Sequence, residues 1–302
     1  MKTALLVLAA GMGSRYGGLK QLEPFGKENK TLLDYSIEDA IRAGFHSIVF
    51  VIRESFFKDF NKKIGANYSK RINIEYAYQK IEDLPYSINF QINRTKPWGT
   101  AQAIWAARNL VKNPFAVINA DDFYGRDAFK KMQKFSESIP LDKNAAKVAG
   151  LMCYRLTNTL SENGYVNRGI CKLSKSNLLE GVEEFTRIQR TKKGEINGVK
   201  PCGKTVILPE NAPVSMNFWA FSPVIFDEIE TYFASFLKNK INDNSTEFYI
   251  PSLVDLLIKD NRLSCRAPET AEHWFGITHP EDKAKVEAEL SKIQNSLEYF
   301  DS

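Results

Sequence analysis

Residues 5–24 read LLVLAAGMGSRYGGLKQLEP, and this stretch decides the fold. Its first part is a continuous apolar run of strand length, which is typical of a central parallel strand covered on both faces. The small residues that follow let backbone N–H groups approach a bound phosphate closely, and Arg15 and Lys20 add two positive charges. The stretch therefore predicts a buried strand that runs into an anion-binding loop.

Two other glycine loops do not fit this spacing. A dinucleotide-binding fingerprint needs a third glycine where Tyr16 stands, and a P-loop needs Lys where Leu19 follows Gly18. A plain glycine-rich turn between strand and helix is the remaining alternative. The two cations beside the glycines favour phosphate binding over that alternative.

The segments AAGMGSR (9–15) and KQLEP (20–24) together resemble the signature loop of the nucleotidyltransferases that make nucleotide sugars and related activated alcohols. In that family the loop wraps the triphosphate of a nucleotide, and its Arg and Lys neutralise charge during nucleotidyl transfer. The resemblance implies catalytic roles for Arg15 and Lys20. It also implies a nucleotide-binding set along the loop, made up of Leu8, Ala9, Ala10, Gly11, Gly13 and Ser14.

Composition describes an ordinary globular chain of 302 residues, 43% hydrophobic and 25% charged, with a net charge of +5. No run of five or six like charges marks a nucleic-acid arm, and a mild positive bias suits small anionic substrates. Four scattered cysteines signal neither a zinc site nor a disulfide framework. No apolar run reaches the roughly 18 residues of a membrane span. We therefore expect a cytoplasmic protein that binds neither nucleic acid nor membrane.

The first third of the chain alternates strand and helix patterns. Thr31 can cap a helix that Gly44 ends, and 47–52 reads as a second buried strand. A helix over 54–64 and a strand over 72–76 follow. This alternation predicts an α/β fold with a doubly wound, mostly parallel sheet of the Rossmann-like type, whose ligands lie at the carboxyl ends of the strands.

Residues 96–103 begin a helix that is expected to reach about Leu110. Gly99 and Thr100 at its start expose unpaired N–H donors and permit close approach of a flat ring. In the resembled family a Gly-[Thr/Leu]-Ala element here contacts the nucleobase and ribose, so the resemblance implies nucleotide-binding roles for both residues. Arg94 occupies the position of a base-reading Gln in some relatives, which leaves the base open.

Residues 115–125 form an apolar strand that ends in Asp121 and Asp122. Adjacent carboxylates at a strand end repel unless a cation or solvent relieves them, and Mg²⁺ prefers one or two carboxylates together with substrate phosphates. A polar turn is the alternative. The family carries a metal-binding Asp in this place, so the resemblance assigns Mg²⁺ to Asp121 and a supporting, nucleotide-proximal role to Asp122.

From Lys147 onward, short strands with polar turns predict a β-rich, acceptor-binding lobe. Three of its segments, 162–169, 182–185 and 215–219, resemble family elements that lie against the sugar, and each is individually weak. A solvated Glu pair or an Asn that only satisfies backbone would explain them equally. The resemblance implies a substrate-binding set of Gly164, Tyr165, Glu184 and Asn217.

Near the end, residues 272–282 resemble the late strand and helix of the family, where relatives often supply a second metal-binding Asp around Gly276. Glycine cannot coordinate a metal through a side chain, so this ligand is missing or comes from elsewhere. His273 and His279 lack a third ligand that would make them a metal site.

These features predict one nucleotidyltransferase domain over 1–302, with a nucleotide-binding half (1–145) and an acceptor-binding half (146–302). A sugar 1-phosphate would attack the α-phosphorus of a nucleoside triphosphate and release pyrophosphate, with Mg²⁺ as cofactor. Whether the chain forms a homo-oligomer is open.

Three alternatives stand beside this interpretation. The first is cytidylyl transfer to a phosphorylated alcohol such as phosphocholine or methylerythritol phosphate. The second is a nucleotide-sugar-dependent glycosyltransferase, which would usually carry an Asp-x-Asp motif that 121–123 does not match. The third is a non-catalytic, nucleotide-binding regulator, which Gly276 would favour if metal binding were lost.

Overall fold

The structure is a computed structural model of the chain. It describes residues 2–11, 24–25, 29–88, 94–141, 148–240, 243–276 and 282–297. Within these ranges, no helix combines the length and the apolar character needed to cross a bilayer.

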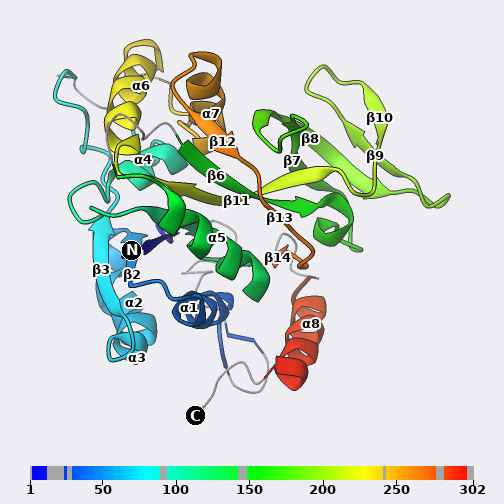
Figure 1. Cartoon of the computed structure of the whole chain (residues 1–302), viewed down its shortest axis with the longest axis horizontal. Helices are drawn as coiled ribbons and strands as arrows, with labels where there is room; N and C mark the ends of the chain where they lie inside the picture. Colours follow the sequence, from blue (N-terminus) through cyan, green and yellow to red (C-terminus); the bar gives the residue numbers. More distant parts are fainter. Residues whose placement is uncertain are drawn as a thin grey trace.

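One large mixed sheet runs through the molecule, with its strands ordered β10-β9-β8-β7-β11-β4-β1-β2-β3, with β6 also paired to β11, and with β12 and β13 paired to β6 (Figure 1). The strands are β1 (Ala4–Leu8), β2 (Ser47–Ile52), β3 (Asn73–Tyr78), β4 (Phe115–Asn119), β6 (Val148–Arg155), β7 (Val166–Leu173), β8 (Leu179–Arg190), β9 (Ile196–Val199), β10 (Thr205–Leu208), β11 (Pro213–Phe221), β12 (Ser264–Arg266) and β13 (Glu269–Thr270). The strands β3, β2, β1 and β4 are parallel, whereas β11 joins β4 in antiparallel fashion. A separate antiparallel pair consists of β5 (Asp122–Phe123) and β14 (Phe275–Gly276).

The parallel strands are buried on both faces, as their continuous apolar runs predict. In β1, Leu5 and Val7 belong to one hydrophobic cluster, whereas Leu6 between them belongs to another. In β4, Ile118 and Val117 divide between the two clusters in the same way. Because successive side chains of a strand point to opposite faces, the sheet separates two cores.

Helices cover both faces of the sheet. They are α1 (Leu32–Ala43), α2 (Phe57–Phe60), α3 (Ala66–Tyr68), α4 (Thr100–Trp105), α5 (Arg126–Ser138), α6 (Ile225–Lys240), α7 (Ile250–Lys259) and α8 (Asp282–Leu297), with short 3-10 or π turns at η2 (Glu54–Phe56), η3 (Asn61–Gly65) and η4 (Leu156–Thr159). Figure 1 shows α4, α6 and α7 together on one side of the sheet, with α1 on the other side and β7–β10 extending away from them. Buried residues of α1 and α5 line one core, and those of α4, α6 and α7 line the other.

The sequence signals for α1 are confirmed. Thr31 caps the helix in a reciprocal capping box with Asp34, and Gly44 ends it in the left-handed conformation at φ 92°. Two expected helices differ. The segment expected as one helix over 54–64 is divided among η2, α2 and η3, and α4 ends at Trp105 before turns that continue to Leu110.

Candidate functional site

The carboxyl ends of β1, β2 and β4 form the edge at which the sequence places its ligand. Leu8 of β1 pairs with Asn119 of β4, and the Ala120 amide donates to the Leu8 carbonyl at 3.1 Å. Ala10 is buried and its carbonyl accepts a hydrogen bond from Arg53 Nε at 3.2 Å, while Gly11 is exposed. The start of the glycine loop therefore lies directly beside the strand that carries the two aspartates.

The structure does not describe the rest of the loop, residues 12–23. Gly13, Ser14, Arg15 and Lys20 lie outside the described residues, so their expected roles stay predictions. Arg53 is a residue that the sequence reasoning missed. It directly follows an apolar strand, and that position was the one signal that could have placed a third cation at this edge.

Asp121 and Asp122 follow β4 after Ala120, with Asp122 opening β5, and both are partly exposed. The Asp122 carboxylate is oriented by two donors, since its Oδ2 accepts from Asn119 Nδ2 at 2.9 Å and from the Tyr124 hydroxyl at 3.1 Å. Burial raises the pKa of the Tyr124 phenol well above its usual value, and the Asp122 charge adds to the shift. Tyr124 therefore stays protonated and can keep donating to Asp122.

Gly276 lies against this acidic pair. It is the antiparallel partner of Asp122, and a Cβ atom built on it would come within 2.7 Å of Asp122 Oδ1 and 3.3 Å of the Asp121 carbonyl oxygen. The structure thus brings residue 276 to the place that the resemblance indicates. The space that a side chain at 276 would fill is taken by the Asp122 carboxylate.

The donor set fits a hard divalent cation that is held mainly by a bound substrate. Asp121 and Asp122 offer carboxylate oxygens, and within the described part of the chain no three His, Cys, Asp or Glu side chains gather as a complete metal site. Mg²⁺ is usually held by one or two carboxylates together with substrate phosphates, so a site of this size suits it. Zn²⁺ in a structural site would need four protein ligands.

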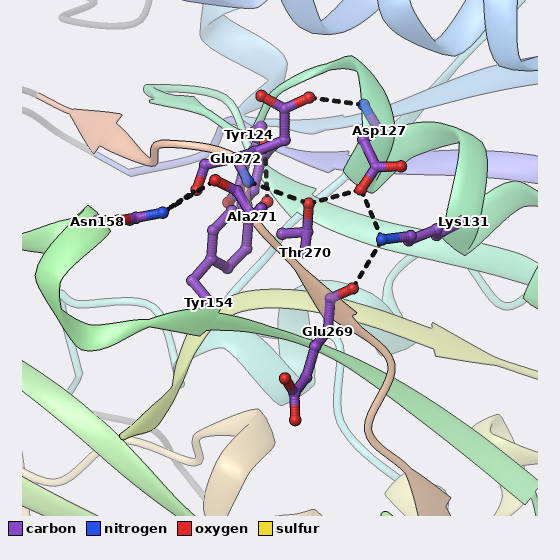
Figure 2. A network of polar contacts seen from close by, with 9 residues as sticks. All are labelled: Tyr124, Asp127, Lys131, Tyr154, Asn158, Glu269, Thr270, Ala271 and Glu272. Carbon is purple, nitrogen blue, oxygen red and sulfur yellow. Dashed lines mark hydrogen bonds and ion pairs between the residues drawn. The ribbon is translucent and has the colours of Figure 1, made fainter. Parts of the chain in front are cut away.

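A polar network fastens the segment before β14 to helix α5 (Figure 2). Glu272 Oε1 accepts from the Asp127 amide at 2.9 Å in the first turn of α5, where Gly125 offers no side-chain cap. The Thr270 hydroxyl donates to Asp127 Oδ2 at 2.8 Å, and Lys131 pairs with the same carboxylate at 2.7 Å. These contacts hold β14, and with it Gly276, beside β5.

Gly99 and Thr100 serve the packing of a neighbouring segment in this structure. Gly99 has a φ of 113°, and a Cβ on it would come within 2.6 Å of the Phe248 carbonyl oxygen. The Thr100 hydroxyl accepts from the Ile250 amide at 3.1 Å in the first turn of α7. Ala101 and Ala103 are buried, as expected for core positions. The glycine is thus required by close approach of backbone, whatever else it contacts.

Arg94 makes structural contacts with two distant segments. Its guanidinium is buried and donates to the carbonyl oxygens of Lys96, Pro97, Asp243 and Thr246 at 2.7 to 3.0 Å. It also lies 4.3 Å from the centroid of the Trp98 ring. Arg94 therefore ties the segment before α4 to the segment before α7.

Glu184 and Gly169 lie opposite each other on β8 and β7. A Cβ on Gly169 would come within 3.1 Å of Glu184 Oε1, so the missing side chain lets the carboxylate lie over β7. Partial burial raises the pKa of the Glu184 carboxyl above its usual value, and the Arg168 charge opposes that shift. Gly169, at the end of the segment 162–169, is a second residue that the sequence reasoning missed.

Asn217 forms part of an irregularity in β11, between Ser215 and Trp219, where the register to β6 shifts. Its φ is 60°, and its Oδ1 accepts from Trp219 Nε1 at 3.5 Å. Bulges of this kind re-aim side chains next to active sites. Ser215 pairs with Gly169, which in turn pairs with Glu184, so β11, β7 and β8 bring these segments together.

Gly164 and Tyr165 lie elsewhere on the same lobe. Gly164 lines a cavity to which neither Glu184 nor Asn217 contributes, and Tyr165 is largely exposed. The structure thus brings Glu184 beside Gly169 and Asp122 beside Gly276. Among the described residues of the expected set, it separates Gly164 from Glu184.

Comparisons with known proteins bear on the family and the fold of the chain. The family model described as nucleotidyl transferase matches residues 4–186. A UTP–glucose-1-phosphate uridylyltransferase of Bacillus subtilis is 28% identical over a 135-residue alignment that covers 39% of this chain and 43% of that enzyme. The match therefore spans less than half the length of this curated relative.

Solved structures with similar folds cover almost the whole chain. A putative glucose-1-phosphate thymidylyltransferase of Bacillus anthracis is 15% identical with a TM-score of 0.61, covering 95% of this chain and 94% of that one. The inositol-1-phosphate CTP transferase of T. maritima is 14% identical with a TM-score of 0.62, covering 98% and 97%. At such identities these likenesses show the fold. Because the family model spans more than half of the sequence, the chain belongs to the nucleotidyl transferase family.

Proposed function

We propose that this protein transfers a nucleotidyl group from a nucleoside triphosphate to a sugar 1-phosphate and releases pyrophosphate. Residues 1–145 would bind the nucleotide and residues 146–302 the acceptor. The protein would work in the cytoplasm without nucleic acid or membrane partners. This proposal fits the fold neighbours, whose names include transferases of glucose 1-phosphate and inositol 1-phosphate.

One observation carries the proposal. The chain leaves β1 toward the glycine loop at the edge where β4 ends, just before the aspartate pair, with Leu8 and Asn119 in register. A triphosphate on the loop would therefore meet the carboxylates within a few residues of either strand end. That juxtaposition of an anion-binding loop and metal-binding oxygens is what phosphoryl chemistry needs.

The proposed reaction requires little covalent chemistry from the protein. The attacking phosphate is already an anion, so no side-chain base is required, and catalysis consists of aligning two polyanions and neutralising the charge between them. Arg15 and Lys20 are proposed for that neutralisation, with the loop amides at Gly11 and Gly13 binding phosphate oxygens. Asp121 would hold Mg²⁺, which would supply further neutralisation when bound. Asp122 would orient the groups around it.

The acceptor is proposed to be a polyhydroxylated phosphate in preference to phosphocholine. A quaternary ammonium head needs a cage of several open aromatic faces, and among the aromatic residues of the acceptor segments Tyr165 alone is largely exposed. Phe218 and Trp219 are fully buried in the two cores. Glu184, in contrast, is accessible to solvent although its carboxyl is partly buried, and that carboxylate can read sugar hydroxyls.

Pyrophosphate release, measured for four nucleoside triphosphates against a panel of sugar 1-phosphates, inositol 1-phosphate and phosphocholine, tests the activity. Asp121→Asn should keep the fold and lose about 10²-fold or more of the turnover, by analogy with other single electrostatic groups. Asp83→Asn is the control, since Asp83 is a partly exposed carboxylate paired with Arg108 elsewhere. Full activity in folded Asp121→Asn would refute the metal assignment. Absence of pyrophosphate release with every pair would refute the function.

A further inference from the structure

Arg53 is a half-buried cation at the carboxyl edge of the parallel sheet, and the proposed function does not use it. It directly follows β2, whose Val51 pairs with Leu8 of β1. The Ala9 amide donates to the Val51 carbonyl at 2.8 Å, and Arg53 Nε donates to the Ala10 carbonyl at 3.2 Å. The guanidinium is therefore fixed beside the point where the chain leaves β1.

The two terminal nitrogens of Arg53 are not used within the described part of the chain. The side chain makes one hydrogen bond there, from Nε to Ala10, and neither terminal nitrogen has a hydrogen-bond or ion-pair partner among those residues. Glu54, the next residue, is paired with Lys80 at 2.7 Å. The terminal nitrogens form a planar fork of donors, a shape that matches two oxygens of a phosphate group. The fork therefore suits a phosphate-like anion.

The strand order puts Arg53 and Asp121 on opposite sides of β1. Strand β4, which leads to Asp121, pairs with one edge of β1, and β2, which leads to Arg53, pairs with the other edge. Neighbouring strands lie about 4.8 Å apart, so the ends of β4 and β2 are separated by roughly 10 Å. A ligand that spans the end of β1 therefore meets the aspartate on one side and the guanidinium on the other.

The acceptor lobe lies on the β4 side of β1. Its strands β11, β7 and β8 follow β4 in the sheet, whereas β2 and β3 lie beyond β1 in the other direction (Figure 1). Under the proposed function, the acceptor phosphate therefore approaches the α-phosphorus from the β4 side. In phosphoryl transfer the attacking and the leaving oxygens are roughly in line across the phosphorus. The leaving pyrophosphate is then expected on the β2 side, where Arg53 lies.

We propose that Arg53 binds the leaving pyrophosphate through its terminal nitrogens, an assignment that rests on the proposed function. An oxygen of the acceptor phosphate forms a bond to the α-phosphorus while the bond from that phosphorus to the bridging oxygen breaks. The electron pair of the broken bond stays with pyrophosphate, and no proton has to move. Negative charge therefore grows on the leaving group, and a cation already fixed there stabilises that charge without reorganisation.

Three properties of Arg53 suit this role. A guanidinium does not lose its proton in proteins, so the charge is present at every working pH. The hydrogen bond to Ala10 holds the planar group in one orientation, which lowers the entropic cost of binding an anion. The side chain is only half-buried, so pyrophosphate bound to it borders solvent and can leave after the transfer.

The test measures binding of inorganic pyrophosphate to the full chain by calorimetry, with Mg²⁺ present and nucleotide absent. Arg53→Gln is the main variant, because the glutamine amide nitrogen takes the place of the arginine Nε and can still donate to Ala10, whereas the charged fork is lost. Lys2→Gln is the matched control. It removes one positive charge from an exposed residue before β1, at the opposite edge of the sheet. Thermal unfolding shows whether each variant is folded.

Pyrophosphate should bind saturably to the wild type, and Arg53→Gln should weaken its affinity about tenfold or more, because hydrogen bonds between charged groups are lost. Lys2→Gln should bind pyrophosphate as the wild type does. Arg53→Lys keeps the charge without the fork, so its affinity should lie between those of the wild type and Arg53→Gln. Nucleoside monophosphates lack the leaving phosphates, and their affinities should be the same for the wild type and Arg53→Gln.

Equal pyrophosphate affinities of Arg53→Gln and Lys2→Gln would overturn the proposal, as would the absence of saturable binding to the wild type. If Arg53→Gln does not fold, an affinity of Arg53→Lys equal to that of the wild type overturns it in the same way. An equal loss of nucleoside monophosphate affinity would also overturn it, because the fork would then contact the part of the nucleotide that is transferred. If pyrophosphate binds through Arg53 but no substrate pair gives turnover, the proposed function fails and the pyrophosphate site stands.

Discussion

Replacing Arg94 by Gln separates a structural role from base reading at one position. The substitution removes a buried guanidinium that donates to four carbonyl oxygens, those of Lys96, Pro97, Asp243 and Thr246. A shorter amide can replace few of these bonds. It should also lose the cation's contact with the Trp98 ring.

The expected loss in the free energy of unfolding is about 3 kcal/mol, the lower end of the cost of breaking a buried charged network. The unfolding entropy of a 302-residue chain is about 0.6 kcal/mol/K, from roughly 2.1 cal/mol/K per residue. The melting temperature should therefore fall by about 5 °C. The melting temperature of Arg94→Lys should fall nearly as far, because an ammonium group lacks the planar, forked donors of a guanidinium.

Calorimetric unfolding measures the loss, and Arg108→Gln is the matched control. Arg108 also stacks on a tryptophan, at 3.6 Å from the Trp105 ring, and pairs with Asp83, but it is 27% exposed. Arg108→Gln should lower the free energy of unfolding by no more than about 1 kcal/mol. The structural role of Arg94 is refuted if Arg94→Gln melts within a degree of the wild type. A changed preference among four nucleoside triphosphates would show that Arg94 also takes part in base reading.

Three further perturbations follow from contacts described above. The pKa of Glu184 is raised in the folded state, so the wild type should lose stability as pH rises from about 4.3 through that pKa. Glu184→Gln does not titrate there, so its free energy of unfolding should rise relative to that of the wild type over this range. A pH-independent difference in denaturant midpoints would contradict this. Gly99→Ala should lower the free energy of unfolding by about 3 kcal/mol, because Gly99 has a φ of 113° and the Phe248 backbone leaves no room for a Cβ. An unchanged melting temperature would contradict this. Glu272→Ala should lower the free energy of unfolding by about 1 kcal/mol and should also lower turnover. Glu269→Ala should do neither, because Glu269 contacts Lys131 through its backbone carbonyl. Equal effects of the two variants would contradict a capping role of Glu272 at the start of α5.

Local signals in the sequence predict much of the fold. The cap at Thr31, the stop at Gly44 and the apolar runs of β1, β2 and β4 depend on short-range patterns, and the structure confirms them. The π turn at Asn61–Gly65 interrupts the helix expected over 54–64, and the spacing of apolar residues does not indicate that turn.

Contacts between distant segments could not be predicted in this way. The reason for Gly99 is the backbone of Phe248, and the reason for Gly276 is the carboxylate of Asp122. Neither partner follows from spacing, since each depends on which strand ends meet in space. Arg94 is similar, because its carbonyl partners Asp243 and Thr246 lie far along the chain. Family resemblance indicated that residue 276 belongs near Asp121, but only the structure shows what fills the gap.

The place of β11 in the sheet has a consequence for how the chain is made. The parallel strands β3, β2, β1 and β4 are complete once Asn119 has left the ribosome, yet β4 has an open edge until Trp219–Phe221 of β11 arrive to pair with it. An apolar strand with an unpaired edge invites association with other chains. The nascent amino-terminal half should thus need shielding by chaperones during synthesis. Chains truncated near residue 145 should aggregate when released.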